Sequence, residues 1–108
     1  MKRGDIVTTA QRGDYGKPRP ALVVQSDTFD ETDSVTLLLI TSQLQDAPLI
    51  RIDITPSNSN GLRKPSQVQI DKLTSAPRDR VGPVIGGVDS QFMLKINRQL
   101  AAFLAIVP

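Results

Sequence analysis

Short runs of strand-forming residues alternate with turn signals along most of this chain, and a single helical pattern follows them. Runs that alternate apolar and polar residues are typical of half-buried strands, and apolar spacings of three and four are typical of an amphipathic helix. Several short strands joined by long loops, with one helix, favour a small barrel. We therefore expect a mainly β fold, an SH3-like small β-barrel with a C-terminal α-helix, in which residues 1–108 form one domain.

Two of the expected strands carry distinctive patterns. Residues 21–24 are continuously apolar, which predicts a strand buried on both faces. Residues 50–54 alternate strictly, which places Ile50, Ile52 and Ile54 on the inner side. The expected strands are residues 5–9, 21–25, 35–41, 50–54, 66–71 and 80–85, joined by loops that include 10–18, an acidic loop over 26–33, and 56–65 with its Asn60-Gly61 turn signal.

The helical pattern begins after Gly86 and Gly87, which are expected to end the sheet. Asp89 or Ser90 is suited to cap the helix N-terminus, because either side chain can accept a backbone N–H bond there. The apolar stripe predicts a helix packed on the core, and its breadth leaves room for a dimer contact. Its members are Phe92, Ile96, Leu100, Phe103 and Val107, widened by Met93 and Leu104, with Lys95, Arg98 and Gln99 on the other side.

Composition excludes several kinds of chemistry. The chain has no cysteine and no histidine, so disulfides, thiolate metal sites and imidazole bases are impossible. It lacks the glycine patterns of nucleotide-binding loops and of hydrolase nucleophile elbows. The acids of residues 27–33 lack the spacing of a calcium loop. We expect no metal and no cofactor, and catalysis by Asp, Glu, Arg, Lys, Ser, Thr or Tyr.

The chain shows neither an apolar signal core near its start nor a run long enough to span a bilayer, which predicts a cytoplasmic protein without membrane contact. The net charge is only +2, but acids gather in residues 27–33 while cations recur elsewhere. This separation is compatible with a basic face for nucleic acid and equally with ordinary surface charge.

The sequence Gly16-Lys17-Pro18-Arg19-Pro20 directly precedes the apolar strand. Because each proline fixes its own φ and restricts the residue before it, Arg19 is held extended and stiff. A preorganised guanidinium matches the geometry of a phosphate. Arg19 is therefore the first candidate for handling an anionic substrate.

Asp14, Lys17 and Arg19 precede the second expected strand, and Thr41 and Ser42 end the third. We expect Arg19 and Thr41 to lie at opposite ends of a simple hairpin, so that a return crossing or a curled strand is needed to join them. Together, a carboxylate, a guanidinium and a hydroxyl are sufficient to cleave RNA by attack of the ribose 2′-OH. Each of these residues also has a purely structural interpretation. Arg19 can form an ion pair with Asp14, Thr41 can be an ordinary strand threonine, and Asp14 can form a turn before Gly16.

At these residues the chain resembles the MazF/PemK-type toxins of bacterial toxin–antitoxin systems. The likeness begins with Arg3-Gly4-Asp5-Ile6-Val7 and the proline-rich motif through Val24, continues through Ile40-Thr41-Ser42-Gln43, and extends over residues 60–72, 78–82 and the terminal helix. The resemblance implies a plasmid-addiction-toxin barrel of the CcdB/MazF kind that forms a homodimer. It also implies a metal-independent, sequence-selective endoribonuclease that cuts single-stranded RNA, leaves 2′,3′-cyclic phosphate and 5′-hydroxyl ends, and arrests growth.

The resemblance also assigns residues. The essential arginine of the family falls on Arg19, its essential threonine on Thr41, and an acidic residue, with the role of base, on Asp14. The implied partner is a small antitoxin whose disordered, acidic tail fills the RNA groove. The implied RNA contacts are Tyr15, Gly16 and Lys17, with Ser42, Gln43 and Gln67 as weaker candidates.

Other functions are compatible with the same expected barrel. CcdB-like relatives share the fold but act on DNA gyrase without enzymatic activity, through residues near the end of the terminal helix. A plain SH3-type interaction domain for proline-rich peptides is a third hypothesis, but its groove requires more aromatic residues than this chain has.

Overall fold

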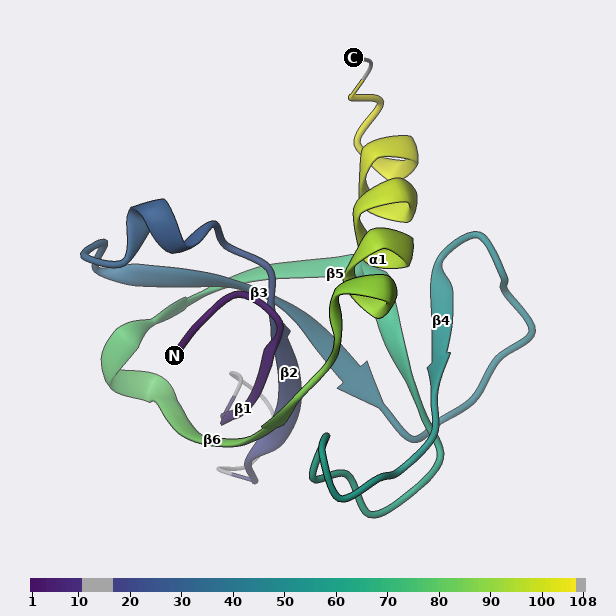
Figure 1. Ribbon diagram of the computed structural model, residues 1–108, viewed down its shortest axis with the longest axis horizontal. Helices are drawn as coiled ribbons and strands as arrows, with labels where there is room; N and C mark the ends of the chain where they lie inside the picture. Colours follow the sequence, from purple (N-terminus) through teal and green to yellow (C-terminus); the bar gives the residue numbers. More distant parts are fainter. Residues whose placement is uncertain (11–16, 107–108) are drawn as a thin grey trace.

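The computed structural model describes residues 1–10 and 17–106. Its six strands form one antiparallel sheet in the order β4-β5-β3-β2-β1-β6 (Figure 1). A helix, α1, follows the last strand. The elements are β1 (Asp5–Thr9), β2 (Arg19–Val23), β3 (Ser34–Thr41), β4 (Arg51–Ile54), β5 (Ser66–Pro77), β6 (Val81–Gly87) and α1 (Ser90–Phe103), with short 3-10 helices at Asp27–Phe29 and Arg78–Arg80.

The sheet curls as a barrel does, but its ladder of strand pairs is open (Figure 1). The pairing recorded among the described residues leaves β4 and β6 as the two edges. The loop over residues 55–65 joins these ends of the sheet, because the Gly87 N–H donates to the Ser59 carbonyl oxygen at 2.9 Å. The expected mainly β fold is confirmed, and part of the barrel wall is a loop instead of a paired strand.

The expected strands agree closely with the observed ones for β1 and β3. Strand β2 begins two residues earlier than expected, at Arg19, and β5 continues to Pro77. The expectation that Gly86 and Gly87 end the sheet was wrong, since both belong to β6. A Cβ at Gly86 would lie 2.3 Å from the Asn60 carbonyl carbon, so this glycine allows the 55–65 loop to cross closely over a paired strand.

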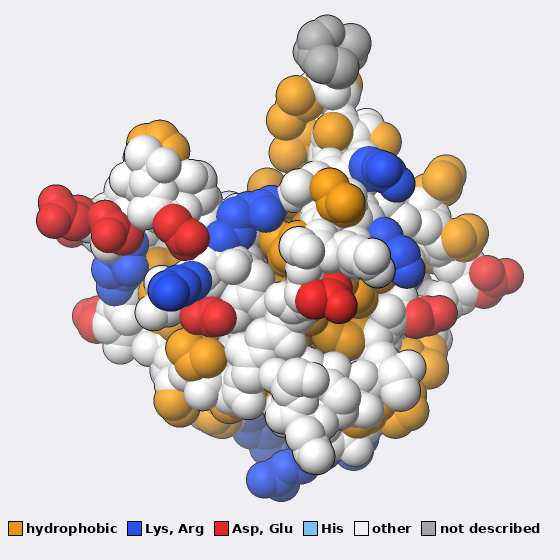
Figure 2. Space-filling model, viewed as in Figure 1, with side chains coloured by type: hydrophobic (Ala, Val, Ile, Leu, Met, Phe, Trp, Pro, Cys, Tyr) orange, Lys and Arg blue, Asp and Glu red, His pale blue; other side chains and the backbone are white. Residues whose placement is uncertain are grey.

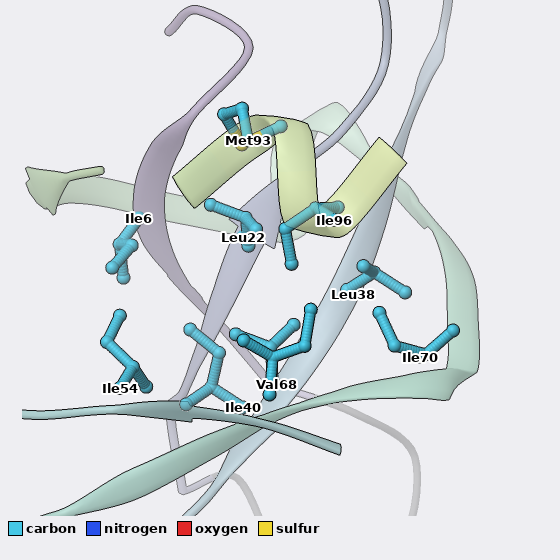
Figure 3. Packing of buried hydrophobic residues seen from close by; sticks show 10 residues of the cluster. Ile6, Leu22, Leu38, Ile40, Ile54, Val68, Ile70, Met93 and Ile96 are labelled. Atoms are coloured by element: carbon cyan, nitrogen blue, oxygen red, sulfur yellow. The ribbon is translucent and has the colours of Figure 1, made fainter. Parts of the chain in front are cut away.

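The central strands are covered on both faces, as the apolar run of β2 predicts. Leu22 belongs to one buried cluster, whereas Ala21 and Val23 belong to another on the opposite face. In the first cluster, side chains from the strands pack beneath Met93 and Ile96 of α1 (Figure 3). Ile52 and Ile54 are buried in this cluster and Ile50 packs against it, which confirms the expected inner side of β4.

Helix α1 is capped by Asp89, whose carboxylate accepts the Phe92 N–H at 2.8 Å. The first half of the helix packs on the sheet, where Met93 and Ile96 are buried. The second half projects from the body of the protein (Figure 1). Apolar side chains at this end of the chain are exposed: Phe103 by 48%, Leu104 by 45% and Ile106 by 61%. Val107, which the sequence placed in the apolar stripe, lies outside the described residues.

The acidic segment over residues 26–33 lies at the surface and contains the 3-10 helix Asp27–Phe29. Carboxylates gather at one side of the face in view, and Lys and Arg side chains gather at its lower edge (Figure 2). Among the described residues, no helix has the length and apolar character needed to cross a membrane.

Candidate active site

Arg19 and Thr41 lie together at one end of the β2–β3 pair. The two strands are antiparallel, with Ala21 opposite Leu39, and continuing this register by two residues places Arg19 opposite Thr41. The expectation that they lie at opposite ends of the hairpin was wrong, because antiparallel pairing puts the start of one strand beside the end of the next. No return crossing is needed to bring the guanidinium and the hydroxyl to one site.

The same register aligns a polar row across five strands. Thr9 of β1 is opposite Arg19, Thr41 is opposite Gln67 of β5, and Gln67 is opposite Asp53 of β4. Directly opposed residues project from the same face of a sheet. The cation and hydroxyl predicted from the sequence are therefore part of a continuous polar band that extends from β1 to the β4 edge.

A pocket of about 230 Å³ opens on this band. It combines one cation, one hydroxyl, two amide side chains and apolar strand residues, a mixture that suits a phosphate with an attached sugar or base. The Arg19 side chain is exposed and Thr41 is half-buried, so both are accessible to a polymer. The pocket is lined by Arg19, Leu39, Ile40, Thr41, Gln43 and Gln69.

The hydroxyl of Thr41 has a defined place. Its oxygen accepts the Gln43 N–H at 3.0 Å, which turns the chain out of β3 directly after Thr41. A hydroxyl that accepts this bond keeps its own hydrogen to donate. The arrangement is suited to a hydrogen bond from Thr41 to a non-bridging phosphate oxygen.

The other predicted site residues differ in their placement. Asp14, Tyr15 and Gly16 lie outside the described residues. Lys17 is exposed two residues before β2 begins, and Ser42 is exposed immediately after β3. Both therefore adjoin the pocket along the chain.

Gln67 lies on the polar row but is only 6% exposed, and it is not among the residues that line the pocket. Sequence reasoning missed Gln69, which does line it and whose amide donates to the Leu39 carbonyl oxygen at 3.4 Å. The signal was available, because residues two apart on a strand share a face. The pairing of β3 with β5 was not available from the sequence.

A larger hollow, of about 570 Å³, lies between the 55–65 loop and the start of α1. The described residues that line it include the carboxylates of Asp53 and Asp89 and contain neither lysine nor arginine. Like charges would repel an RNA phosphate there, so electrostatics favours the smaller pocket at Arg19. Within residues 1–10 and 17–106, no group of three acidic, cysteine or histidine side chains is arranged to hold a metal ion.

Comparisons with known proteins match nearly the whole chain. A family model described as PemK-like, MazF-like toxin of type II toxin–antitoxin system matches residues 2–104. A probable endoribonuclease MazF from Mycolicibacterium smegmatis (strain ATCC 700084 / mc(2)155) is 46% identical over 107 residues, covering 98% of this chain and 98% of the relative. Endoribonuclease EndoA from Bacillus subtilis (strain 168) is 25% identical over 115 residues, covering 99% of this chain and 97% of EndoA.

A solved structure, described as an endoribonuclease in complex with its cognate antitoxin from Mycobacterial species, shares the fold. Its TM-score is 0.81 at 23% sequence identity, and the match covers 100% of this chain and 98% of that one.

Proposed function

The chain belongs to the family of PemK-like, MazF-like toxins of type II toxin–antitoxin systems, and we propose that it cuts single-stranded RNA at the pocket that holds Arg19 and Thr41. It is a MazF-type endoribonuclease toxin. The observation that carries the choice of site is the register that sets the guanidinium beside the hydroxyl. A base-selective cut is expected to depend on the amides of Gln43 and Gln69, which line the same pocket.

The proposed reaction is an internal transesterification that needs no metal. The ribose 2′-oxygen forms a bond to the adjacent phosphorus while the bond from phosphorus to the 5′-oxygen breaks. The products are a 2′,3′-cyclic phosphate and, once the leaving oxygen takes a proton from solvent, a 5′-hydroxyl. The Arg19 guanidinium stabilises the negative charge that develops on the phosphorane oxygens, and the Thr41 hydroxyl donates a hydrogen bond to one of them. Asp14 is the proposed base for the 2′-hydroxyl.

We propose contacts with RNA from the residues that adjoin this pocket. Lys17 brings a second cation to the phosphate backbone, and Tyr15, Gly16 and Ser42 are close to the proposed catalytic residues in the sequence. A strand splayed out of a duplex can present its bases to such a pocket and reach the in-line geometry of the reaction.

The proposed partners are a second copy of the chain and an antitoxin, in the cytoplasm. The exposed apolar end of α1 supports the dimer, since such a patch is otherwise in contact with water. An antitoxin with a disordered acidic tail would block the site by placing carboxylates against Arg19 and Lys17. One solved structure with the same fold contains its cognate antitoxin, which supports this proposal.

The gyrase-directed and peptide-binding alternatives are less well supported. The family model and both curated relatives are of the MazF or endoribonuclease kind. A parallel supercoiling assay with DNA gyrase keeps the first alternative testable, because a CcdB-like toxin would inhibit supercoiling and leave RNA intact.

The test uses purified protein, a single-stranded transcript and EDTA. The wild-type protein is expected to cut the transcript, and Arg19→Ala is expected to lose cleavage while it melts at the wild-type temperature. Arg63→Ala is the matched control, because Arg63 is an exposed arginine on the 55–65 loop and is expected to keep activity. Cleavage by Arg19→Ala at the wild-type rate would contradict the proposed site, and an unfolded Arg19→Ala protein would support the structural alternative for this residue.

A further inference from the structure

The amide side chain of Gln67 has all of its hydrogen bonds within the protein. Its Nε2 donates to the Gln45 carbonyl oxygen at 3.1 Å and to Asp53 Oδ1 at 2.8 Å. Its Oε1 accepts the Gln45 N–H at 3.1 Å and a guanidinium N–H of Arg51 at 2.9 Å. A glutamine amide has two hydrogens to donate and two lone pairs to accept with, so these bonds use its whole capacity. A nucleotide could bond to it only by displacing one of them.

The hydrogen bonds of Gln67 hold the loop that follows β3, the strand that ends at Thr41. The exchange of two hydrogen bonds with the Gln45 backbone fixes that residue from both its N–H and its C=O. Arg51, which bonds to Gln67, also donates to the Gln43 carbonyl oxygen at 2.9 Å. The segment over residues 43–45 is therefore bonded to β4 through the Gln43 carbonyl and to β5 through the Gln45 backbone.

The same loop determines the geometry of the pocket. Gln43 lines the pocket, and its N–H holds the Thr41 hydroxyl oxygen. A chain of contacts therefore runs from Gln67 through Gln45 and Gln43 to Thr41. Catalytic groups need supporting hydrogen bonds of this kind, because a shift of about 1 Å can reduce the rate about a hundredfold.

We propose that Gln67, Arg51 and Asp53 form a bracket that holds residues 43–45 in place and thereby positions the Thr41 hydroxyl and the Gln43 side chain for RNA cleavage. In this role Gln67 is a positioning residue, in place of the direct RNA contact expected from the sequence. The inference rests on the proposed ribonuclease function, and it adds Arg51 and Asp53 as residues that support the site from the β4 edge.

Gln67→Glu is the sharpest test, because it keeps the shape of the side chain and replaces the donor by an acceptor. Two carboxylates would then face each other across the 2.8 Å contact with Asp53. Activity is expected to fall about tenfold in kcat with KM nearly unchanged, since the loss affects positioning and not binding. Gln91→Glu is the matched control, because Gln91 is exposed in the first turn of α1 and the same charge is added there.

Asp53→Asn supplies the rescue. Alone it keeps an oxygen that can accept from Gln67 and is expected to behave as the wild type. In combination with Gln67→Glu, its amide can donate to the new carboxylate, and most of the lost kcat is expected to return. The bracket would be overturned if the Gln67→Glu protein kept the wild-type kcat or changed only in KM. It would also be overturned if the double variant had a kcat no higher than that of Gln67→Glu.

Amide hydrogen exchange tests the bracket without RNA. Gln67→Met has a side chain of similar length that makes none of the four bonds, and it is expected to speed exchange of the Gln45 amide about tenfold. The Val24 amide, which donates to Thr36, is the internal reference and should keep its rate. Unchanged exchange at Gln45 would contradict the bracket. If the wild-type protein cuts no RNA but Gln45 is released by Gln67→Met, the proposed function fails and the bracket stands.

Discussion

Arg19 has a restricted backbone and an exposed side chain. Pro18 and Pro20 limit the backbone on either side of it, and β2 begins at Arg19 itself, so the guanidinium extends from a fixed point at the strand end. Its side chain is exposed, which means that folding does not depend on burying it. A side chain with a restricted backbone and an accessible guanidinium is suited to stabilising negative charge that appears only during the reaction.

Arg19→Lys separates charge from geometry. Lysine keeps the positive charge but lacks the planar fork that can bond two phosphate oxygens at once. We expect kcat to fall about a hundredfold while the melting temperature is unchanged. Arg63→Lys provides the control on an exposed loop arginine. Wild-type turnover by Arg19→Lys would mean that a point charge is enough and that the fork has no role.

The Thr41 hydroxyl is tested by a pair of substitutions. Thr41→Ser keeps the oxygen that accepts the Gln43 N–H, and Thr41→Val keeps the branched shape but removes the oxygen. The serine variant is expected to retain cleavage within a few-fold, and the valine variant to lose about a hundredfold in kcat. Single-turnover kinetics separates this effect from product release. An active valine variant would show that the hydroxyl is not used.

At the scale of elements, the 55–65 loop is organised around Asn60. Its Oδ1 accepts the Ser57 and Leu62 N–H groups, each at 3.0 Å, and its Nδ2 donates to the Thr55 carbonyl oxygen at 2.8 Å. Gly61 follows with φ of 72°, a left-handed conformation that favours glycine. The loop therefore has one defined shape, in which it crosses β6 and completes the barrel wall.

Asn60→Ala tests that role of the loop. The substitution leaves three partly buried backbone groups without their partners, and the free energy of unfolding is expected to fall by about 2–3 kcal/mol. Asn58→Ala, at an exposed position in the same loop, is expected to change it by no more than about 0.5 kcal/mol. Urea unfolding measures both. Equal stabilities of the two variants would mean that the loop does not contribute to closing the fold.

Local patterns were sufficient to predict most elements from the sequence. Strict alternation identified β4, a continuous apolar run identified β2, and the helix cap was narrowed to Asp89 or Ser90, because such signals lie within a few residues of each other. The length of β5 and the continuation of β6 through Gly86 were missed, since they depend on strands and loops that are distant in the sequence. Arg19 and Thr41 were selected from the sequence as candidate site residues, but their placement side by side could be derived only from the strand register.

In the whole molecule, the second half of α1 projects from the body of the protein (Figure 1), and hydrophobic side chains are exposed on it (Figure 2). Phe103, Leu104 and Ile106 are exposed there and belong to neither buried cluster. The breadth of the stripe in the sequence left room for a dimer contact in addition to packing on the core. The first half of the helix packs on the sheet of its own chain. We propose that the second half contacts another copy.

Phe103→Glu tests the dimer. Burial of a phenylalanine at an interface contributes about 1.5–3 kcal/mol, so introducing a carboxylate there is expected to weaken self-association at least about tenfold. Phe29→Glu is the control, because Phe29 is 57% exposed on the acidic segment at another side of the molecule. Sedimentation equilibrium reports the association constants. Unchanged association of Phe103→Glu would exclude this end of the helix from the interface.

In the proposed mechanism, the ribose 2′-oxygen attacks phosphorus at the Arg19–Thr41 pocket. The most direct measurement compares two oligonucleotides in EDTA, one entirely RNA and one with a single 2′-deoxy nucleotide on the 5′ side of the scissile bond. We predict that the first is cut to a 2′,3′-cyclic phosphate and that the second remains intact at that bond. Equal cleavage of the two oligonucleotides would contradict the mechanism.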